Sequence, residues 1–249
     1  MDKHKKWVLN TYPSYWNRAA HKYGLDAYCQ RLIDIISSYG PKNVFELAIG
    51  NGYPLADGLE GRSIAVAGLD ISPLLIQELN KSNPNIHATA GLFEEYIVDE
   101  VKKYDIVYCL RSSWYFENFL NAVEFMIAMT KPEGYIIFDI MNADSVHNKS
   151  MIRKKNLSFP YTVIKNTIKT LLNMLSGSQK YMIDSIFGVR EIMRSRNEIE
   201  SFLNNSGFSY KALTLSDVLG QSGQWLQTSN DQKILYIVKN IKMHHDNIF

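Results

Sequence analysis

Residues 44–52 constrain the fold of this chain more than any other stretch. They read Val-Phe-Glu-Leu-Ala-Ile-Gly-Asn-Gly, an apolar run that contains an acid and ends in a Gly-x-Gly turn. A second apolar run, from Ile64 to Asp70, also ends in an acid, 18 residues after Gly52. A strand, a glycine turn, a helix and a second strand that ends in an acid make a βαβ unit typical of nucleoside binding. Glycine lets the backbone approach a ligand, and the Asp70 carboxylate can accept hydrogen bonds from ribose hydroxyls.

Strand and helix patterns alternate along most of the chain. Apolar runs predict strands at 43–48, 64–70, 86–90, 104–110 and 135–141. Helical spacing and N-cap signals predict helices at about 26–38, 73–82, 93–102 and 117–130. The rhythm breaks over 142–185 and resumes with a helix at about 197–206 and strands at about 208–215 and 233–239. This alternation assigns the chain to the α/β class.

Composition and charge exclude several kinds of protein. The 249 residues carry a net charge of +2, so the chain as a whole is not an electrostatic nucleic-acid binder. We find no run of ~20 apolar residues and expect no membrane span. The first residues lack a long apolar run, so we expect no signal peptide and a cytoplasmic protein. Cys29 and Cys109 have no metal-ligand spacing and are expected to be reduced core thiols, without a metal site.

Several motifs follow the order found in one enzyme family. Glu46-Leu-Ala-Ile-Gly-Asn-Gly52 is similar to that family's acid-x-Gly-x-Gly-x-Gly turn, with Ala48 in place of the first glycine. Asp70 corresponds to its acid after the second strand. Further matches are Tyr104 to Val107 in the fourth strand, Lys131-Pro-Glu-Gly134 for a Lys-Pro-Gly-Gly turn, Asn205-Ser-Gly-Phe208 before the sixth strand, and the aromatic leader Tyr15 to Tyr23. With these motifs the chain resembles the class I S-adenosylmethionine-dependent methyltransferases of the small-molecule type.

The resemblance implies a fold and a cofactor. The expected fold is a Rossmann-like, seven-stranded, mostly parallel sheet with helices on both faces and an antiparallel last strand. One methyltransferase domain would span 1–249, with N-terminal lid helices in 1–40 and a helical cap insertion in 142–185. The cofactor would be S-adenosylmethionine. Its expected contacts are Tyr15, Glu46, Ala48, Gly50, Gly52, Asp70, Ile71, Leu92, Phe93 and Leu110.

The adenine end of this expected site departs from the family pattern. Family members often place an aspartate after the third strand, but residues 90–94 read Ala-Gly-Leu-Phe-Glu. Backbone amides, with packing on Leu92 or Phe93, would then hold the adenine. Glu46 can contact the amine of the cofactor's methionine part, or it can serve only to orient the glycine turn.

Acceptor and catalytic candidates lie after the fourth and fifth strands. Open α/β sheets bind ligands at the carboxyl ends of their strands, where Arg111 to Trp114 are expected. The acceptor is expected to meet Trp16, Tyr23, Ser113, Trp114 and Arg153. Arg111 and His147 are the catalytic candidates. His147 can act as a general base, since the ordinary pKa of histidine is ~6.5, or be a solvated loop residue. If Arg111 proves necessary for cofactor affinity, it belongs to the cofactor site instead.

The segment 142–185 is unusually basic. From 145 to 185 it contains seven lysines and arginines against one acid, Asp184, whereas the rest of the chain is slightly acidic. Apolar residues at helical spacing, Tyr161, Ile164, Ile168, Leu171, Leu172 and Leu175, predict a helix that packs on the sheet. As a cap, this segment would favour an acceptor with a phosphate or carboxylate, such as a nucleotide-linked sugar. The alternatives are a solvated basic face and, less favoured, docking on an anionic membrane surface.

The sequence disfavours one alternative function, dinucleotide binding, and leaves two others open. A nicotinamide dinucleotide would require a third glycine at position 55, which is leucine. The remaining alternatives are a cofactor-fold protein that binds or regulates a partner without turnover, and an RNA-modifying methyltransferase. We expect methyl transfer to an oxygen or nitrogen of a small, anionic metabolite, and we do not expect nucleic acid as a partner. Whether a general base is used and which oligomer forms are open questions.

Overall fold

The computed structural model describes residues 26–97, 103–150, 192–220 and 230–242, together with 163–165, 167–168, 171–172 and 175. Four predicted site residues, Tyr15, Trp16, Tyr23 and Arg153, lie outside these residues. Most of the predicted lid 1–40 and most of the predicted cap 142–185 lie outside them as well. Among the described parts of the chain, no helix is both long enough and apolar enough to cross a membrane.

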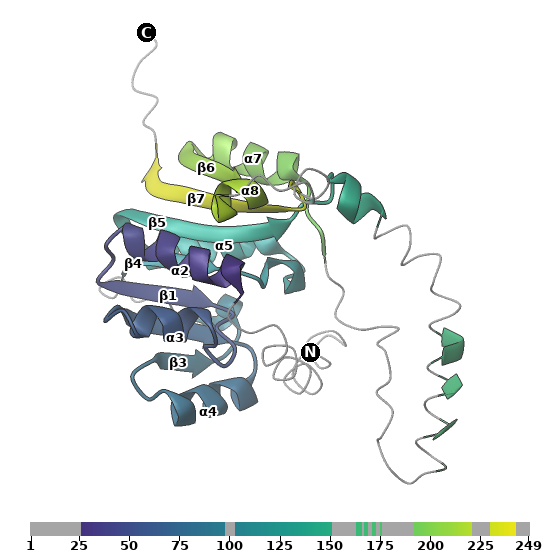
Figure 1. Cartoon of the computed structure of the whole chain (residues 1–249). Coiled ribbons are helices and arrows are strands. Elements are labelled where there is room, and N and C mark those ends of the chain that lie inside the picture. The colour runs from purple at the N-terminus through teal and green to yellow at the C-terminus, as the bar shows by residue number, and fades with distance from the viewer. Residues whose placement is uncertain are drawn as a thin grey trace.

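Seven strands form one sheet in the order β3-β2-β1-β4-β5-β7-β6 (Figure 1). In chain order they are β1 Asn43–Leu47, β2 Ala65–Asp70, β3 His87–Ala90, β4 Tyr104–Cys109, β5 Thr130–Met141, β6 Phe208–Thr214 and β7 Lys233–Lys242. The pairs β1–β2, β1–β4, β2–β3 and β4–β5 are parallel. Only β7 runs against its neighbours β5 and β6. The predicted Rossmann-like, mostly parallel sheet is confirmed.

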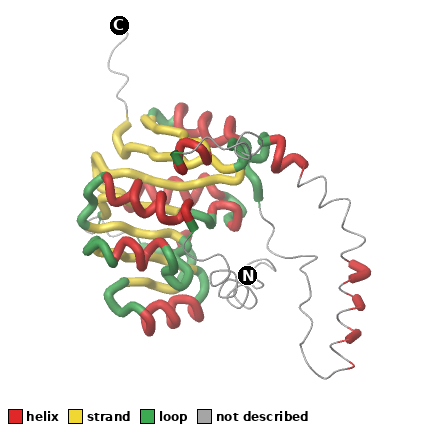
Figure 2. Tube along the Cα trace, viewed as in Figure 1, coloured by secondary structure: helices red, strands yellow, loops and turns green. Residues whose placement is uncertain are grey.

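Helices cover both faces of the sheet (Figure 2). They are α2 Ala27–Ser38, α3 Leu55–Glu60, α4 Pro73–Ser82, α5 Phe119–Met129, α7 Arg196–Asn205 and α8 Leu215–Leu219. Alternate residues of each strand point to opposite faces, so Val44 belongs to the core cluster that includes α2, α3 and α8, while Phe45 belongs to the cluster that includes α5 and α7. The central strands β1 and β4 are therefore largely apolar, as strands covered on both sides are, whereas the outer strands β3 and β6 carry polar, exposed residues.

Polar side chains set where the helices begin. Asp26 accepts a hydrogen bond from the Cys29 amide at 2.8 Å at the start of α2. Ser72, followed by Pro73, accepts one from the Leu75 amide at 3.4 Å at the start of α4. These caps satisfy amide groups that the first turn of a helix leaves unpaired, and the sequence predicted the second of them.

Three local predictions were wrong or incomplete. The predicted helix at 93–102 is, in its described part, only the 3-10 turn η1, Phe93–Glu95. The short helix α8 was not predicted, because its five residues give too short a periodic pattern. Strand β5 begins at Thr130, before the predicted turn, and its pairing with β4 jumps from Thr130 to Tyr135. Residues 131–134 form the bulge that this jump requires.

The described residues of the insertion do not pack as predicted. Residues 142–150 are anchored: Asn148 is buried, and its side-chain amide donates to the carbonyls of Asn142 at 2.8 Å and Gln232 at 2.9 Å. Further along, the apolar side chains are 40% to 84% exposed, at Ile164, Ile168, Leu171, Leu172 and Leu175. Figure 2 draws these helical pieces apart from the sheet. The predicted packing of this apolar face on the sheet is therefore not seen for these residues, because periodicity indicates an apolar face without specifying what covers it.

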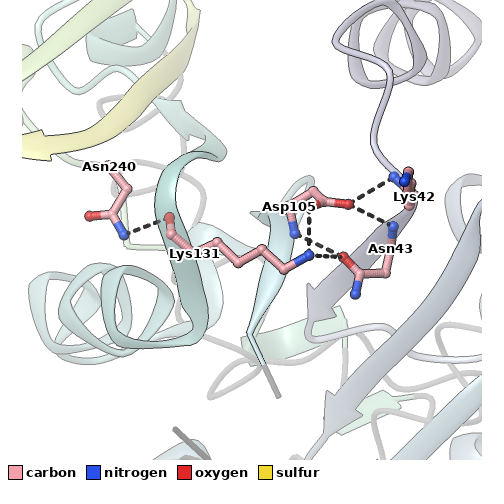
Figure 3. A network of polar contacts seen from close by, with 5 residues as sticks. All are labelled: Lys42, Asn43, Asp105, Lys131 and Asn240. Atoms are coloured by element: carbon pink, nitrogen blue, oxygen red, sulfur yellow. Dashed lines mark hydrogen bonds and ion pairs between the residues drawn. The ribbon is translucent and has the colours of Figure 1, made fainter. Parts of the chain in front are cut away.

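A polar network holds the amino-terminal edge of the parallel strands (Figure 3). The Asp105 carboxylate accepts hydrogen bonds from the amides of Lys42 at 2.8 Å and Asn43 at 3.0 Å, and from the Lys131 ammonium at 2.7 Å. Burial raises the pKa of Asp105, but Lys131 and the two amides lower it by more, so the net pKa is below its usual value. The network joins β1, β4 and the bulge of β5.

The bulge also contains Glu133, the residue that departs from the Lys-Pro-Gly-Gly turn of the family. Glu133 has a φ of 68°, the left-handed conformation that glycine adopts without strain, and its carboxylate pairs with the Lys239 ammonium at 2.9 Å. The next residue must be glycine, because a Cβ at Gly134 would lie 2.7 Å from the Asp105 carbonyl oxygen. The turn therefore adopts a left-handed residue at Glu133 and requires glycine only at position 134.

Candidate functional site

The glycine turn follows β1 at the carboxyl edge of the sheet. Ala48, Gly50 and Gly52 all have positive φ values, of 65°, 59° and 79°. The amides of Ala48 and Ile49 donate to the Leu69 carbonyl at 2.8 Å and 3.2 Å, which ties the turn to β2. Ala48 thus adopts the left-handed conformation of the glycine that it replaces, at a cost of ~1–2 kcal/mol.

Asp70 lies beside this turn and is only 7% exposed. Its Oδ2 accepts a hydrogen bond from the Gly50 amide at 2.9 Å and its Oδ1 accepts one from the Ser72 amide at 2.8 Å. Burial raises the pKa of Asp70 to about 6, although these two amides oppose the shift. A carboxylate oxygen has two acceptor positions, so each oxygen can still receive a hydroxyl. This arrangement fits a ribose diol.

Glu46 is the second buried acid at this edge. It is 4% exposed and its Oε2 accepts a hydrogen bond from the Tyr108 hydroxyl at 2.9 Å. Burial raises its pKa well above the usual value, Asp70 adds to the shift, and the Tyr108 hydrogen bond opposes it. A cation placed against Glu46 would favour the ionised carboxylate.

A cavity opens between the ends of β1 and β4. Its lining consists of Glu46, Ala48, Ile49, Gly52, Tyr53, Pro54, Leu55, Leu110, Arg111 and Ser112. Five of these were predicted as site residues: Glu46, Ala48, Gly52, Leu110 and Arg111. The strand order makes β1 and β4 neighbours, which is the switch point where open α/β sheets bind ligands. The glycine turn, the diol acceptor Asp70 and this cavity thus lie at the edge of the sheet where this fold class binds nucleosides.

Comparison with known proteins decides the family. Residues 15–179, more than half of the chain, match the family described as a methyltransferase domain. The chain is a class I S-adenosylmethionine-dependent methyltransferase. A comparison with curated protein sequences finds no match.

Solved structures share the fold of this methyltransferase at low sequence identity. A possible histamine N-methyltransferase from Thermotoga maritima is 15% identical with a TM-score of 0.60, and the match covers 95% of this chain and 98% of that one. The plantazolicin methyltransferase BpumL, bound to a desmethylPZN analog and S-adenosylhomocysteine, is 15% identical with a TM-score of 0.63 and coverage of 96% and 94%. Magnesium protoporphyrin IX methyltransferase from Synechocystis PCC 6803, with bound S-adenosylhomocysteine, is 14% identical with a TM-score of 0.58 and coverage of 94% and 96%. S-adenosylmethionine is accordingly the cofactor of the enzyme.

Two features restrict position 52 of the methyltransferase to glycine, the backbone conformation and the neighbouring side chains. A Cβ at this position would lie 2.7 Å from Leu79 Cδ1 and 3.6 Å from the Ala56 Cβ. A side chain there would therefore meet α3 and α4, in addition to the strain of a φ of 79°. Gly52 contributes its backbone to the cavity, and its lack of a side chain serves core packing.

Residues predicted to hold the adenine lie next to Asp70. The Gly91 amide donates to the Asp70 carbonyl at 2.8 Å, which brings the end of β3 to the end of β2. Leu92 and Phe93 follow, both partly exposed, and the Phe93 ring packs 5.7 Å from the rings of Phe116 and Phe125. Ile71 is partly exposed between Asp70 and Ser72.

The acceptor candidates lie beyond the cavity. Ser113 and Trp114 belong to the 3-10 turn η2, Ser113–Tyr115, and both are buried. Neither lines the cavity described above. His147 is exposed on the helical residues 146–150 after β5 and does not line it either. The role of His147 as a base stays a prediction.

Two functional candidates, Asp139 and Lys233, were missed by sequence reasoning. Asp139, in the middle of the apolar run of β5, is fully buried and accepts hydrogen bonds from the Arg111 amide at 2.7 Å and the Tyr28 hydroxyl at 3.2 Å. Burial raises the pKa of Asp139, and the charge of Lys233 opposes the shift. The Lys233 ammonium lies 5.0 Å from the Tyr28 ring centroid and 5.2 Å from that of Trp114. An acid inside an apolar strand was the available signal for Asp139.

Proposed function

We propose that the enzyme transfers the methyl group of S-adenosylmethionine to an oxygen or nitrogen of a small, anionic metabolite. The supporting observation is the placement of Lys233. Because β7 is antiparallel, its first residue pairs with Met141 at the end of β5, at the edge that carries the cavity. Two aromatic rings hold the Lys233 ammonium there, and its charge also acts on the buried Asp139 carboxylate. A cation that is already restrained can bind an anionic acceptor at lower entropic cost.

The proposed cofactor contacts follow the geometry of the carboxyl edge. Asp70 would accept the ribose hydroxyls, and Ala48, Gly50 and Gly52 would bring their backbone against the ligand. Glu46 and Leu110 would line the methionine end, while Ile71, Leu92 and Phe93 would surround the adenine. Tyr15 remains part of this proposal from the sequence alone.

The cofactor supplies a methyl group already activated on a sulfonium. The protein therefore has to orient the acceptor atom and exclude water, which favours the direct displacement. Trp114 and Ser113, together with Trp16 and Tyr23 from the leader, are the residues proposed to do this. A hydroxyl acceptor would need a base, for which His147 remains the candidate, whereas an amine has only to arrive unprotonated.

The insertion 142–185 is proposed as the cover of the acceptor site. It leaves the carboxyl end of β5, and its first residues are anchored against β7 through Asn148. Its basic residues, Arg153 among them, would add to the positive charge of Lys233. The similar enzymes are named for plantazolicin, magnesium protoporphyrin IX and, as a possibility, histamine, so the acceptor class proposed here depends on this chain's own residues.

The test is methyl transfer against a pool of cell metabolites. The purified chain is incubated with S-adenosylmethionine and a metabolite extract, and methylated products are identified by mass spectrometry. We expect products that carry phosphate or carboxylate, and slower formation of them by Lys233→Met. A preferred acceptor without negative charge would overturn the proposed acceptor class. Absence of both product and S-adenosylhomocysteine binding would overturn the enzymatic function.

A further inference from the structure

Arg111 is held in place by contacts at both ends of the residue. Its backbone has a φ of 60°, a conformation that costs a residue with a side chain ~1–2 kcal/mol. Its amide donates to the buried Asp139 carboxylate at 2.7 Å, and its guanidinium Nη1 lies 2.8 Å from the Cys29 Sγ of α2. Such strain persists only where the surroundings enforce it. The fold therefore fixes both the backbone and the side chain of Arg111.

The cavity beside Arg111 has one acidic and one basic side chain in its lining. Glu46 is the last residue but one of β1 and Arg111 follows β4, and these two strands are hydrogen-bonded neighbours. The methionine part of S-adenosylmethionine has an ammonium and a carboxylate on the same carbon atom. A carboxylate and a guanidinium on the walls of one cavity are complementary to that pair, and guanidinium binds carboxylate in a two-pronged geometry.

The residues that line the cavity also indicate whether Arg111 contacts the cofactor or the acceptor. The cavity includes Ala48 and Gly52 of the glycine turn, which is the cofactor's side of the site. The acceptor candidates Ser113 and Trp114 are buried in η2 and are not part of this lining. The position of Arg111 thus favours the cofactor over the acceptor.

We propose that Arg111 binds the carboxylate of the methionine part of S-adenosylmethionine and that Asp139 is the positioning residue that holds Arg111 there. This rests on the proposed cofactor site at the glycine turn. Asp139 reaches Arg111 from β5, and its second oxygen accepts the Tyr28 hydroxyl of α2. The carboxylate therefore connects three separate parts of the chain at the wall of the cavity. Arg111 is then a cofactor residue, in place of its predicted catalytic role.

The experiment compares two ligands that differ only in the carboxylate. S-adenosylhomocysteine and its decarboxylated analogue, S-adenosyl-3-thiopropylamine, are titrated calorimetrically into the full chain. The wild-type enzyme should bind S-adenosylhomocysteine about 10- to 100-fold more tightly, since a hydrogen bond to a charged group has that effect. Arg111→Met and Arg111→Gly should bind both ligands about equally. The glycine variant suits the positive φ and guards against a folding defect.

Variants at Asp139 test its positioning role. Asp139→Asn keeps an oxygen for the Arg111 amide and should retain most of the discrimination between the ligands, whereas Asp139→Leu should lose it. A merely structural effect would weaken both ligands equally and leave their ratio unchanged. Arg196→Met makes the same chemical change as Arg111→Met at an exposed ion pair of α7 and should behave as wild type.

The outcomes separate this inference from the proposed function. If Arg111→Met and Arg111→Gly keep the wild-type ratio of the two affinities, Arg111 does not bind the carboxylate, although the cofactor site stands. If the wild-type chain does not bind S-adenosylhomocysteine, the cofactor site itself is refuted. If Asp139→Leu folds and keeps the ratio, the positioning role of Asp139 is refuted while that of Arg111 stands.

Discussion

An aspartate lies near a strand end at each edge of the sheet, and the two aspartates differ in their partners and in the direction of their pKa shifts. Asp105, at the amino-terminal edge, has an ammonium and two amides as partners, and its pKa lies below the usual value. Asp70, at the carboxyl edge, has two amides and no ion-pair partner among the described residues, and burial raises its pKa to about 6. The first carboxylate is satisfied by the fold, whereas the second keeps acceptor capacity for a ligand.

This contrast separates an edge whose polar contacts stabilise the fold from an edge that has the features of a binding site. The amino-terminal edge joins β1, β4 and β5 through charge pairing. The carboxyl edge instead accumulates buried acids, at Glu46, Asp70 and Asp139, beside left-handed backbone at Ala48 and Arg111; left-handed backbone also occurs at Glu133 of the other edge. Such buried acids are typical of functional sites, where a ligand or a neighbouring group compensates the cost of their burial.

The largest expected effect is on cofactor affinity when Asp70 is changed. Asp70→Ala should weaken S-adenosylhomocysteine binding by at least about 10-fold, since a charge-assisted hydrogen bond is worth ~1.5–3 kcal/mol. Calorimetry measures the dissociation constant of S-adenosylhomocysteine. The same substitution at the other edge, Asp105→Ala, is the matched control and should leave the dissociation constant unchanged. Equal losses in both variants would remove the distinction between the edges.

Next in size is the effect of Asp105→Ala on stability. The variant leaves the amides of Lys42 and Asn43 without their acceptor, so the free energy of unfolding should fall by about 2 kcal/mol. The folded pKa of Asp105 is lowered, so its contribution is present above pH ~3.9 and is lost as the pH falls through the folded pKa. Urea unfolding of the wild type and the variant at pH 7 and near pH 3 measures the loss of stability and its dependence on pH. A stability difference that does not shrink at low pH would contradict the charge pairing.

The pH dependence of binding should report Asp70. Ribose hydroxyls bind the carboxylate better than the neutral acid, so affinity should be full above about pH 7 and decline as the pH falls through the Asp70 pKa of about 6. At pH 5 the expected loss is up to about 10-fold. Asp70→Asn, which cannot titrate, should bind weakly with a flatter profile. If wild type and variant decline in parallel, another group is responsible.

The smallest expected effect concerns the two positions where a family glycine is replaced. Ala48→Gly should relieve left-handed strain and raise the free energy of unfolding by up to ~1 kcal/mol, less the extra backbone entropy of glycine. Glu133→Gly relieves the same strain but loses the exposed ion pair with Lys239, so its gain in stability should be smaller. Chemical unfolding measures the free energy of unfolding of both variants. If Ala48→Gly is less stable than the wild type, the packing of the Ala48 methyl group outweighs the strain.

The sequence predicted the elements whose signals are local. Glycine turns, the Ser72 cap and apolar runs specified the βαβ unit and brought Glu46, Ala48, Gly52, Leu110 and Arg111 to one cavity. Residues that meet only through pairing of distant strands gave no such signal. Asp139 reaches the Arg111 amide only because β5 lies beside β4, and Lys233 reaches the same edge only because β7 is antiparallel. The exposed face of the insertion escaped prediction because periodicity does not specify what covers a helix.

The position of β7 has a consequence for how the protein is made. The strand β6 pairs only with β7, and β7 lies between it and β5. While the ribosome is still adding residues before Lys233, β5 has an open edge and β6 has no strand to join. A nascent chain at that stage presents unpaired backbone to its neighbours in the cell. The step that completes the sheet therefore depends on some of the last described residues to be synthesised, and it brings Lys233 beside Tyr28 of α2, about 200 positions earlier in the sequence.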